Sequence, residues 1–148
     1  MSEAVAATAL PEPTQDERTM ATLAHVLQMV GGFIAPLIIF FLRRESRFVS
    51  FHALQVLFLQ IANILFSMVF MVAWFAMIFG SIAATAGKPQ GGGPPIMMFL
   101  IFPFIWIFMM LSWVTILTAA IVYGIKAGRG EWANYPVLGG WARRVLNI

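Results

Sequence analysis

Apolar residues dominate three stretches of the chain, and each is long enough for a membrane crossing. No Asp, Glu, Lys or Arg occurs between Arg47 and Lys88, or between Lys88 and Lys126. A helix needs about 20 mostly apolar residues to cross a bilayer. A third apolar stretch ends at a cluster of three arginines at positions 43, 44 and 47. The pattern predicts transmembrane helices at about 22–42, 53–80 and 96–125.

The first of these stretches contains residues that disturb a helix. Gly31, Gly32 and Pro36 lie near its middle, and a proline inside a helix removes one backbone hydrogen bond. Two interpretations follow: a full crossing, or a re-entrant hairpin that enters and leaves the membrane on one side. We take the crossing as the working prediction.

The remaining segments are polar or rich in glycine and proline. Residues 1–19 form an acidic, proline-containing tail, which we predict to be disordered. Residues 81–95 contain three consecutive glycines and three prolines, and this composition predicts a loop. Residues 127–148 follow the transmembrane region 20–126 and combine tryptophans with arginines, as a short interfacial helix would.

Composition agrees with this pattern and narrows the fold class. Hydrophobic residues make up 61% of the 148 residues and charged residues only 10%, whereas a soluble domain has about 25% charged residues. The prediction is an all-α membrane protein, a bundle of about three transmembrane helices with a C-terminal interfacial segment. The net charge of +3 comes from residues that border the apolar stretches, so we expect no nucleic-acid partner.

The basic residues also predict an orientation. Three of the nine lie between the first and second predicted helices and four follow the third, whereas Arg18 and Lys88 fall on the other side. Lys and Arg near span ends are retained in the cytoplasm. We therefore predict an integral membrane protein with the N-terminus outside and the C-terminus cytoplasmic.

Polar residues inside the predicted helices are the first place to look for function. His52, Gln55, Gln60 and Asn63 fall on one face of the second helix, and His25 shares a face with Gln28 on the first. Such stripes either line a path for a proton, ion or polar substrate or form hydrogen bonds between helices. We favour hydrogen bonding, because the predicted helices contain no Asp or Glu.

Catalysis and metal binding find little support. Two histidines could ligate a metal, but a site needs three or four donors, and the chain has no cysteine and no carboxylate within the predicted helices. Motifs for phosphate binding, nucleophilic catalysis or metalloprotease activity do not occur. We expect no cofactor and no enzymatic activity, since Glu131 is the one plausible acid-base group near the membrane border.

Three sequence segments resemble a known family. They are Thr22 to His25, Phe48 to Gln55 with its His-Ala-x-Gln pattern, and Lys126 to Pro136 with a closing Gly-Glu-x-x-x-Tyr-Pro pattern. The chain is similar to an uncharacterised bacterial family of small membrane proteins that is distantly similar to the Tic20-type chloroplast import component. The resemblance implies a location in a bacterial cytoplasmic membrane. The resemblance, together with the polar stripes, singles out His25, His52, Gln55, Gln60, Asn63, Glu131, Tyr135 and Pro136 as the candidate motif.

These observations favour a structural or interaction protein. We expect a helix bundle that contacts the lipid bilayer and associates with itself or with a membrane-protein partner. The alternative is a component of a transport or protein-translocation assembly. For His52 and Gln55, one turn apart, our hypothesis is that they bond backbone carbonyls freed by Pro36.

Overall fold

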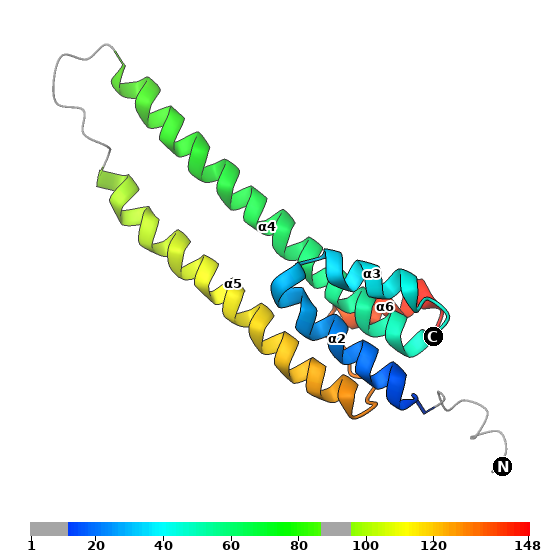
Figure 1. Ribbon diagram of the computed structural model, residues 1–148. Helices are drawn as coiled ribbons and strands as arrows, with labels where there is room; N and C mark the ends of the chain where they lie inside the picture. The colour runs from blue at the N-terminus through cyan, green and yellow to red at the C-terminus, as the bar shows by residue number, and fades with distance from the viewer. Residues whose placement is uncertain (1–11, 87–95) are drawn as a thin grey trace. The chain divides into compact units, whose positions relative to one another are not determined.

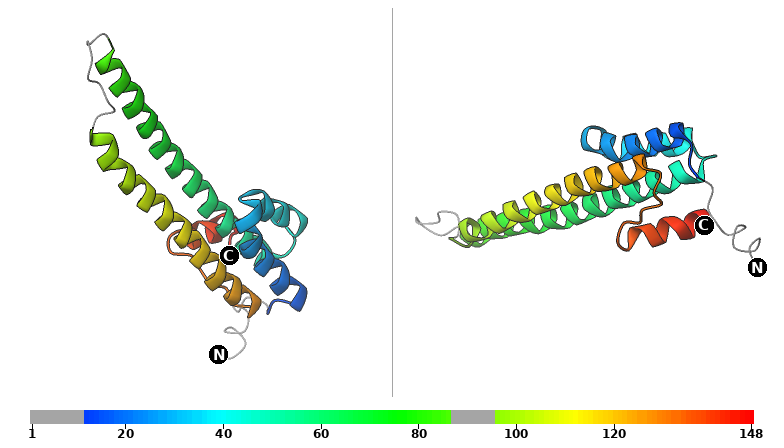
Figure 2. Two further views of the ribbon diagram at one scale, coloured as in Figure 1. Left: turned by 60° about the vertical axis from the view of Figure 1, so that its left-hand side comes forward. Right: turned by 90° about the horizontal axis from the view of Figure 1, so that it is seen from below.

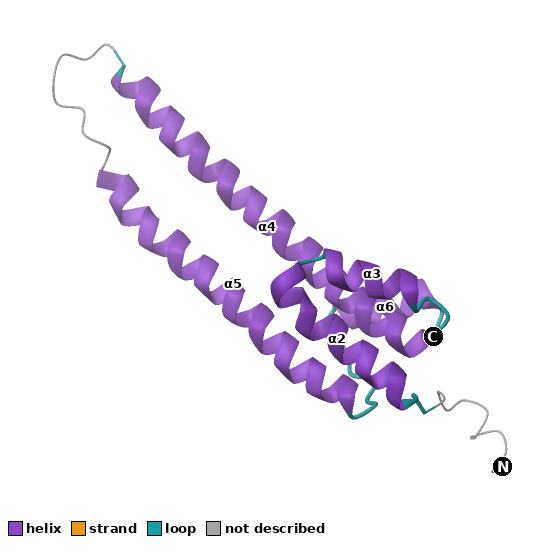
Figure 3. Cartoon of the chain, in the orientation of Figure 1, coloured by secondary structure: helices purple, strands orange, loops and turns teal. Residues whose placement is uncertain are grey.

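The described part of the chain contains only helices as regular structure. The computed structural model describes residues 12–86 and 96–148, with the backbone alone for 96–98. Its helices are α2 (Gln15–Gly31), α3 (Ile34–Leu42), α4 (Arg47–Thr85), α5 (Ile96–Gly128) and α6 (Leu138–Leu146) (Figures 1 and 3). The predicted all-α class is confirmed.

Two of these helices, α4 and α5, are long and apolar enough to cross a membrane. Their 39 and 33 residues correspond to about 58 and 50 Å at 1.5 Å per residue, beyond the ~30 Å hydrocarbon core. Helix α4 begins before the predicted position 53 and continues to Thr85, so residues 81–85 of the predicted loop are helical. Ala86 forms a turn at the end of this helix, and residues 87–95 of the predicted loop lie outside the described residues.

The predicted first transmembrane helix is replaced by two shorter helices, and the described chain has two candidate crossings where the sequence predicted three. The break falls at Gly32, whose φ of +53° favours glycine. Pro36 lies in the first turn of α3, where its missing N–H costs no helical hydrogen bond. Helix α3 packs beside α2 (Figure 2), so together they form a hairpin, the α2–α3 hairpin.

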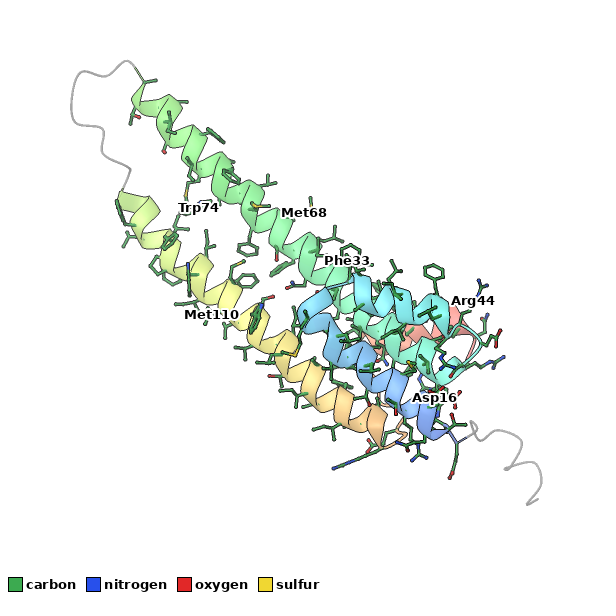
Figure 4. All side chains as sticks on the ribbon, viewed as in Figure 1. Asp16, Phe33, Arg44, Met68, Trp74 and Met110 are labelled. Carbon is green, nitrogen blue, oxygen red and sulfur yellow. The ribbon has the colours of Figure 1, made fainter. Side chains whose placement is uncertain are left out.

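Polar contacts join the two ends of this hairpin. The Arg43 guanidinium lies 2.9 Å from the Asp16 carboxylate, and the Ser46 hydroxyl donates to Glu17 at 2.6 Å. Figure 4 shows Phe33 at the turn, with Asp16 and Arg44 at the opposite end of the hairpin. Asp16 and Arg43 therefore lie at the same end of the hairpin, and the predicted orientation, with the N-terminus outside and the C-terminus cytoplasmic, stays a prediction.

Helix α2 begins inside the segment that was predicted to be disordered. Thr14 is the N-cap: its hydroxyl accepts from the Glu17 N–H, and the Glu17 carboxylate accepts from the Thr14 N–H at 2.8 Å. This reciprocal capping box satisfies two backbone donors that a helix start leaves unpaired. The tail prediction for 1–19 is therefore wrong from residue 15 onward, and residues 1–11 lie outside the described chain.

The stability of the contacts at the base of the hairpin should depend on pH. The Ser46 hydroxyl, followed by the Thr14 N–H, holds the pKa of Glu17 below its usual value. A carboxyl group with a lowered folded-state pKa contributes its full stabilisation above the unfolded pKa of about 4.3 and loses it as the pH falls through the lower folded value. We expect faster hydrogen exchange in the first turn of α2 on acidification, after correction for the intrinsic rate. The Glu17→Gln variant should show faster exchange already at neutral pH, and equal exchange in both proteins would contradict the prediction.

The chain divides into two compact units: a terminal unit, Met1–Phe58 with Ala119–Ile148, and a central unit, Leu59–Thr118. In the terminal unit, Ala24, Ile39 and Val49 bring together α2, α3 and α4 in one buried cluster. Phe51 of α4 and Ala142 of α6 belong to another. These small and apolar side chains let the helices approach closely, because alanine adds little bulk at a contact.

The central unit pairs α4 and α5 in antiparallel directions. Asn63 accepts a hydrogen bond from Ser112, the rings of Phe70 and Phe108 stack at 4.4 Å, and further along Trp74 lies 5.7 Å from Phe102. A groove of about 470 Å³ lies between the two helices and is lined almost wholly by aromatic, methionine and isoleucine side chains. Polar side chains thus pair within this unit, and its outer surface is apolar.

Candidate functional site

Two buried histidines lie at the centre of the terminal unit. His25 of α2 and His52 of α4 have no exposed surface, and His25 Nε2 lies 3.0 Å from His52 Nδ1. The other nitrogen of His25 is 2.9 Å from the Tyr135 hydroxyl. The other nitrogen of His52 is 3.1 Å from the Glu131 carbonyl. The two rings therefore connect α2, α4 and the segment that follows α5.

The groups at the two ends of this row, the Tyr135 hydroxyl and the Glu131 carbonyl, fix the direction of its three hydrogen bonds. The Glu131 carbonyl can only accept, so His52 Nε2 carries a hydrogen. Neither ring bonds a carboxylate in the described structure, and an unpaired buried charge is costly, so we assign both rings as neutral. His52 Nδ1 then accepts from His25 Nε2, and His25 Nδ1 accepts from the Tyr135 hydroxyl. Donation runs one way, from Tyr135 to the Glu131 carbonyl.

Tyr135 is suited to be the first donor in this row of hydrogen bonds. Burial raises the pKa of its hydroxyl above the usual value, and a side-chain hydrogen bond with Gln28 opposes that shift. The hydroxyl therefore keeps its proton at neutral pH and can donate a hydrogen bond to His25. Gln28 is buried on α2, one turn after His25, so the same helix provides two groups that hold Tyr135.

Gln55 completes the attachment of the segment after α5. Its side-chain nitrogen donates to the Ala133 carbonyl at 3.2 Å, and its side-chain oxygen accepts from the Tyr135 N–H at 2.5 Å. His52 and Gln55 are three residues apart and so share one face of α4. Their carbonyl partners belong to the segment Glu131 to Tyr135, so the hypothesis that they bond carbonyls freed by Pro36 is wrong.

Aromatic packing surrounds these hydrogen bonds. Trp132 lies against Phe48 and Phe51, with ring centroids 5.1 and 5.5 Å apart. Tyr135 meets Tyr123 of α5 edge to face at 4.2 Å. Aromatic pairs in this geometry stabilise beyond the area they bury. The segment is thus held by side chains as well as by its backbone, and water is kept from the polar atoms.

Helix α6 follows after a tight turn. Val137 has φ +67° and ψ −57°, and the Leu138 N–H bonds the Pro136 carbonyl at 2.8 Å, which together describe a strained γ-turn. Gly139 is buried, and a Cβ there would lie 2.7 Å from the Asn134 Cβ. Arg143 donates from Nε to Asn134 at 2.9 Å. The segment Glu131 to Tyr135 and helix α6 therefore pack directly against each other.

The structure brings together most, but not all, of the predicted motif. His25, His52, Gln55 and Tyr135 meet in the network, whereas Glu131 takes part through its backbone and its side chain is exposed. Pro136 is exposed in the turn before α6, and Gln60 is buried on α4. Asn63 lies in the central unit, bonded to Ser112. Sequence reasoning missed the packing roles of Tyr123, Trp132 and Gly139. The aromatic contacts of Tyr123 and Trp132 join residues far apart in the sequence, so no local spacing could have indicated them.

The arrangement is suited to holding the fold rather than to binding a metal. The two nitrogens of His25 point to different partners, so no single ion could bind the imidazoles and Tyr135 together in this geometry. Among the residues that the structure describes, no group of three or more His, Cys, Asp or Glu side chains could hold an ion. The ring nitrogens of His25 and His52, the Tyr135 hydroxyl and both polar side-chain atoms of Gln55 are all used in internal hydrogen bonds.

Removal of one hydroxyl tests the network at its first donor. In the Tyr135→Phe variant, His25 Nδ1 loses its donor while the ring packing against Tyr123 is kept. An unpaired buried acceptor costs about 1–3 kcal/mol. We expect a loss of unfolding free energy in that range, measured by chemical denaturation in detergent. The Tyr123→Phe variant is the matched control, because the Tyr123 hydroxyl is not one of the groups that form the hydrogen bonds of the described network. Equal stability of the two variants would argue against the assigned bond.

Helices long enough to cross a membrane and a buried polar network define a multi-helix membrane protein. Residues 16–142 match the Magnetosome magnetite crystal formation protein family. The match covers most of the chain, so the protein belongs to this family. A comparison with curated proteins found no match, and a comparison with solved structures found none either. Membership of a family of small membrane proteins is thus confirmed, and the relation to the Tic20-type component stays a prediction.

Proposed function

We propose that this protein is a structural or interaction component of a magnetosome membrane and acts in magnetite crystal formation without catalysing a reaction. The family match over residues 16–142 is the observation that carries the proposal. Helices α4 and α5 anchor the chain in the bilayer, and its surface associates with further copies or with a membrane complex.

The distribution of polar and apolar groups supports an interaction function. In the terminal unit, the polar side chains of the network bond to one another and to backbone groups. In the central unit, large apolar side chains such as Met71, Trp106 and Met110 are exposed or line the groove. Flexible methionines and rigid aromatics are adaptable contact surfaces for lipid or for another helix. Catalysis would require polar groups with free bonding capacity at an accessible site.

The α2–α3 hairpin supports a revised orientation. With both ends of the hairpin on one side, eight of the nine basic residues lie on that side: one is in the first turn of α2, three lie between the end of α3 and the first residue of α4 inclusive, and four lie in the last turn of α5 or after it. Lys88 is the exception. We propose that this basic side is cytoplasmic and that both ends of the described chain lie on it. The connection between α4 and α5 then falls on the opposite side of the membrane. Placing Arg18 on this side removes one of the two exceptions to the positive-inside rule.

Location and effect on the mineral can be tested together. Expressed as a fluorescent fusion in a magnetite-forming bacterium, the protein should copurify with magnetosome membranes and alter crystal size when overproduced. Electron microscopy of isolated crystals provides the second measurement. A fusion that is stably inserted but found throughout the cell membrane, with unchanged crystals, would overturn the proposal.

Water access distinguishes an interaction component from the transport alternative. Asn63 and Ser112 bond each other, as helix packing predicts. Cysteine substitutions at positions 60, 63 and 67 should therefore resist a water-soluble maleimide, whereas rapid labelling of all three would favour a conduit. The chain contains no cysteine, so each variant carries a single reactive site.

A further inference from the structure

We infer that the α2–α3 hairpin enters one leaflet of the membrane and returns to the same surface, and that this one-sided insertion makes the protein accumulate on curved membranes. The occupant of the exposed hairpin surface is therefore lipid. The inference rests on the membrane location of the chain and does not depend on the proposed part in crystal formation.

The tip of the hairpin is apolar, which is unusual for a helical turn in water. No charged residue occurs from Thr19 to Leu42. At the tip, Val30 is 92% exposed and Ile34 is 55% exposed, and Phe33 lies at the turn (Figure 4). Each large apolar side chain left in water forgoes about 1.5–3 kcal/mol of burial free energy. In a membrane protein, lipid is the environment that removes this cost.

The base of the hairpin is polar, and its shorter arm has the length of half a bilayer. Asp16 with Arg43 and Glu17 with Ser46 close the base, where charged groups can stay at the headgroup level. The nine residues of α3 rise about 14 Å and the 17 residues of α2 about 26 Å, against a hydrocarbon core of about 30 Å. The α3 arm therefore has the length of one leaflet, and neither arm is long enough to cross the whole core.

The hairpin is docked firmly, so its insertion adds a fixed volume. The Thr22 hydroxyl donates to the Gly124 carbonyl of α5 at 3.2 Å, and Ile39 packs in one cluster with Val49 of α4. In the same unit, Trp141 and Val145 form an exposed apolar stripe on α6 beside Arg144, as in interfacial helices. Elements that enter one leaflet without crossing expand that leaflet alone, which favours a membrane that is convex toward the basic side.

The first experiment measures the depth of the tip. A fluorophore attached to the Val30→Cys variant in sealed vesicles should be quenched by brominated lipids and protected from water-soluble quenchers on both sides. The Glu45→Cys variant, in the exposed connector, should show the reverse. Quenching of the tip from the water on either side would overturn the inference. Protection of the tip from both kinds of quencher would also overturn it, because a protein partner would then cover the hairpin.

The second experiment measures curvature preference with a matched pair of variants. Protein reconstituted into mixed-size vesicles of phosphatidylcholine and phosphatidylglycerol should reach at least about twice the surface density on the smallest vesicles, counting copies whose basic side faces outward. Val30→Leu keeps an apolar tip and should retain this preference. Val30→Asp places a charge in the leaflet and should lose it, although thermal stability in detergent should change little at so exposed a position.

The outcomes separate this inference from the proposed function. Equal densities of the unmodified protein on small and large vesicles would overturn curvature preference, and so would an unchanged preference in Val30→Asp. If the protein still copurified with magnetosome membranes and altered crystal size in either case, the proposed function would stand without this inference.

Discussion

Replacing His52 with alanine should lower the unfolding free energy by about 4 kcal/mol, which combines a buried cavity with the loss of two hydrogen bonds. The ring is fully buried between His25 and the Glu131 carbonyl. Its removal leaves the carbonyl without its donor and His25 Nε2 without its acceptor. Chemical denaturation in detergent measures the loss, and reduced abundance in membranes should accompany it.

An exposed position in the same unit provides the control for this variant. Arg44→Ala changes an exposed side chain in the connector and should alter stability by no more than about 0.5 kcal/mol. A double-mutant cycle that combines His52→Ala with Tyr135→Phe adds a sharper test, because His52 and Tyr135 both bond His25. The double variant should lose less unfolding free energy than the sum of the two single losses. Additive losses would contradict a connected network.

Gly139→Ala should cost about 3 kcal/mol, because the added methyl group has no room. Its Cβ would lie 2.7 Å from the Asn134 Cβ, 2.9 Å from the Asn134 Cα and 3.0 Å from the Gln55 side-chain oxygen. Since one of these atoms belongs to the backbone, the segment itself must move, and the Gln55 hydrogen bonds should weaken with it. Faster hydrogen exchange at Tyr135, together with a lower unfolding midpoint, would record both effects.

The adjacent glycine gives a closely matched control. A Cβ at Gly140 would meet nothing within 4 Å, and alanine favours a helix over glycine by about 1 kcal/mol. Gly140→Ala should therefore be neutral or stabilising. If both variants lost stability to the same extent, a general sensitivity of α6 to substitution would explain the result, and close packing at Gly139 would not.

The long apolar segments were predictable because lipid leaves so few choices. An uncharged stretch of that length must be helical to satisfy its backbone, and α4 and α5 follow from this requirement. The start of α2 was also within reach, since Thr14 and Glu17 have the spacing of a capping box. The start of α2 was missed because disorder was inferred from the average composition of residues 1–19, and the spacing of these two residues was not considered.

The hairpin and the network depend on information that local sequence does not contain. Gly32 and Pro36 allowed either a kinked crossing or a reversal, and the outcome follows contacts such as Arg43 with Asp16, whose partners are far apart in the sequence. His25 and His52 were recognised as polar residues in apolar surroundings. Their partners are hydroxyl and carbonyl groups more than 70 residues away, and a backbone carbonyl has no sequence pattern at all.

The separation between His25 and Tyr135, 110 residues, has a consequence for biosynthesis. A ribosome delivers the N-terminal helices first, so both imidazoles emerge long before the groups that will satisfy them. Until Tyr135 leaves the exit tunnel, α2 can dock only incompletely, and the nascent chain is open to quality-control proteases. A chain truncated before Tyr135 should therefore be degraded, although both of its long apolar helices have already been made.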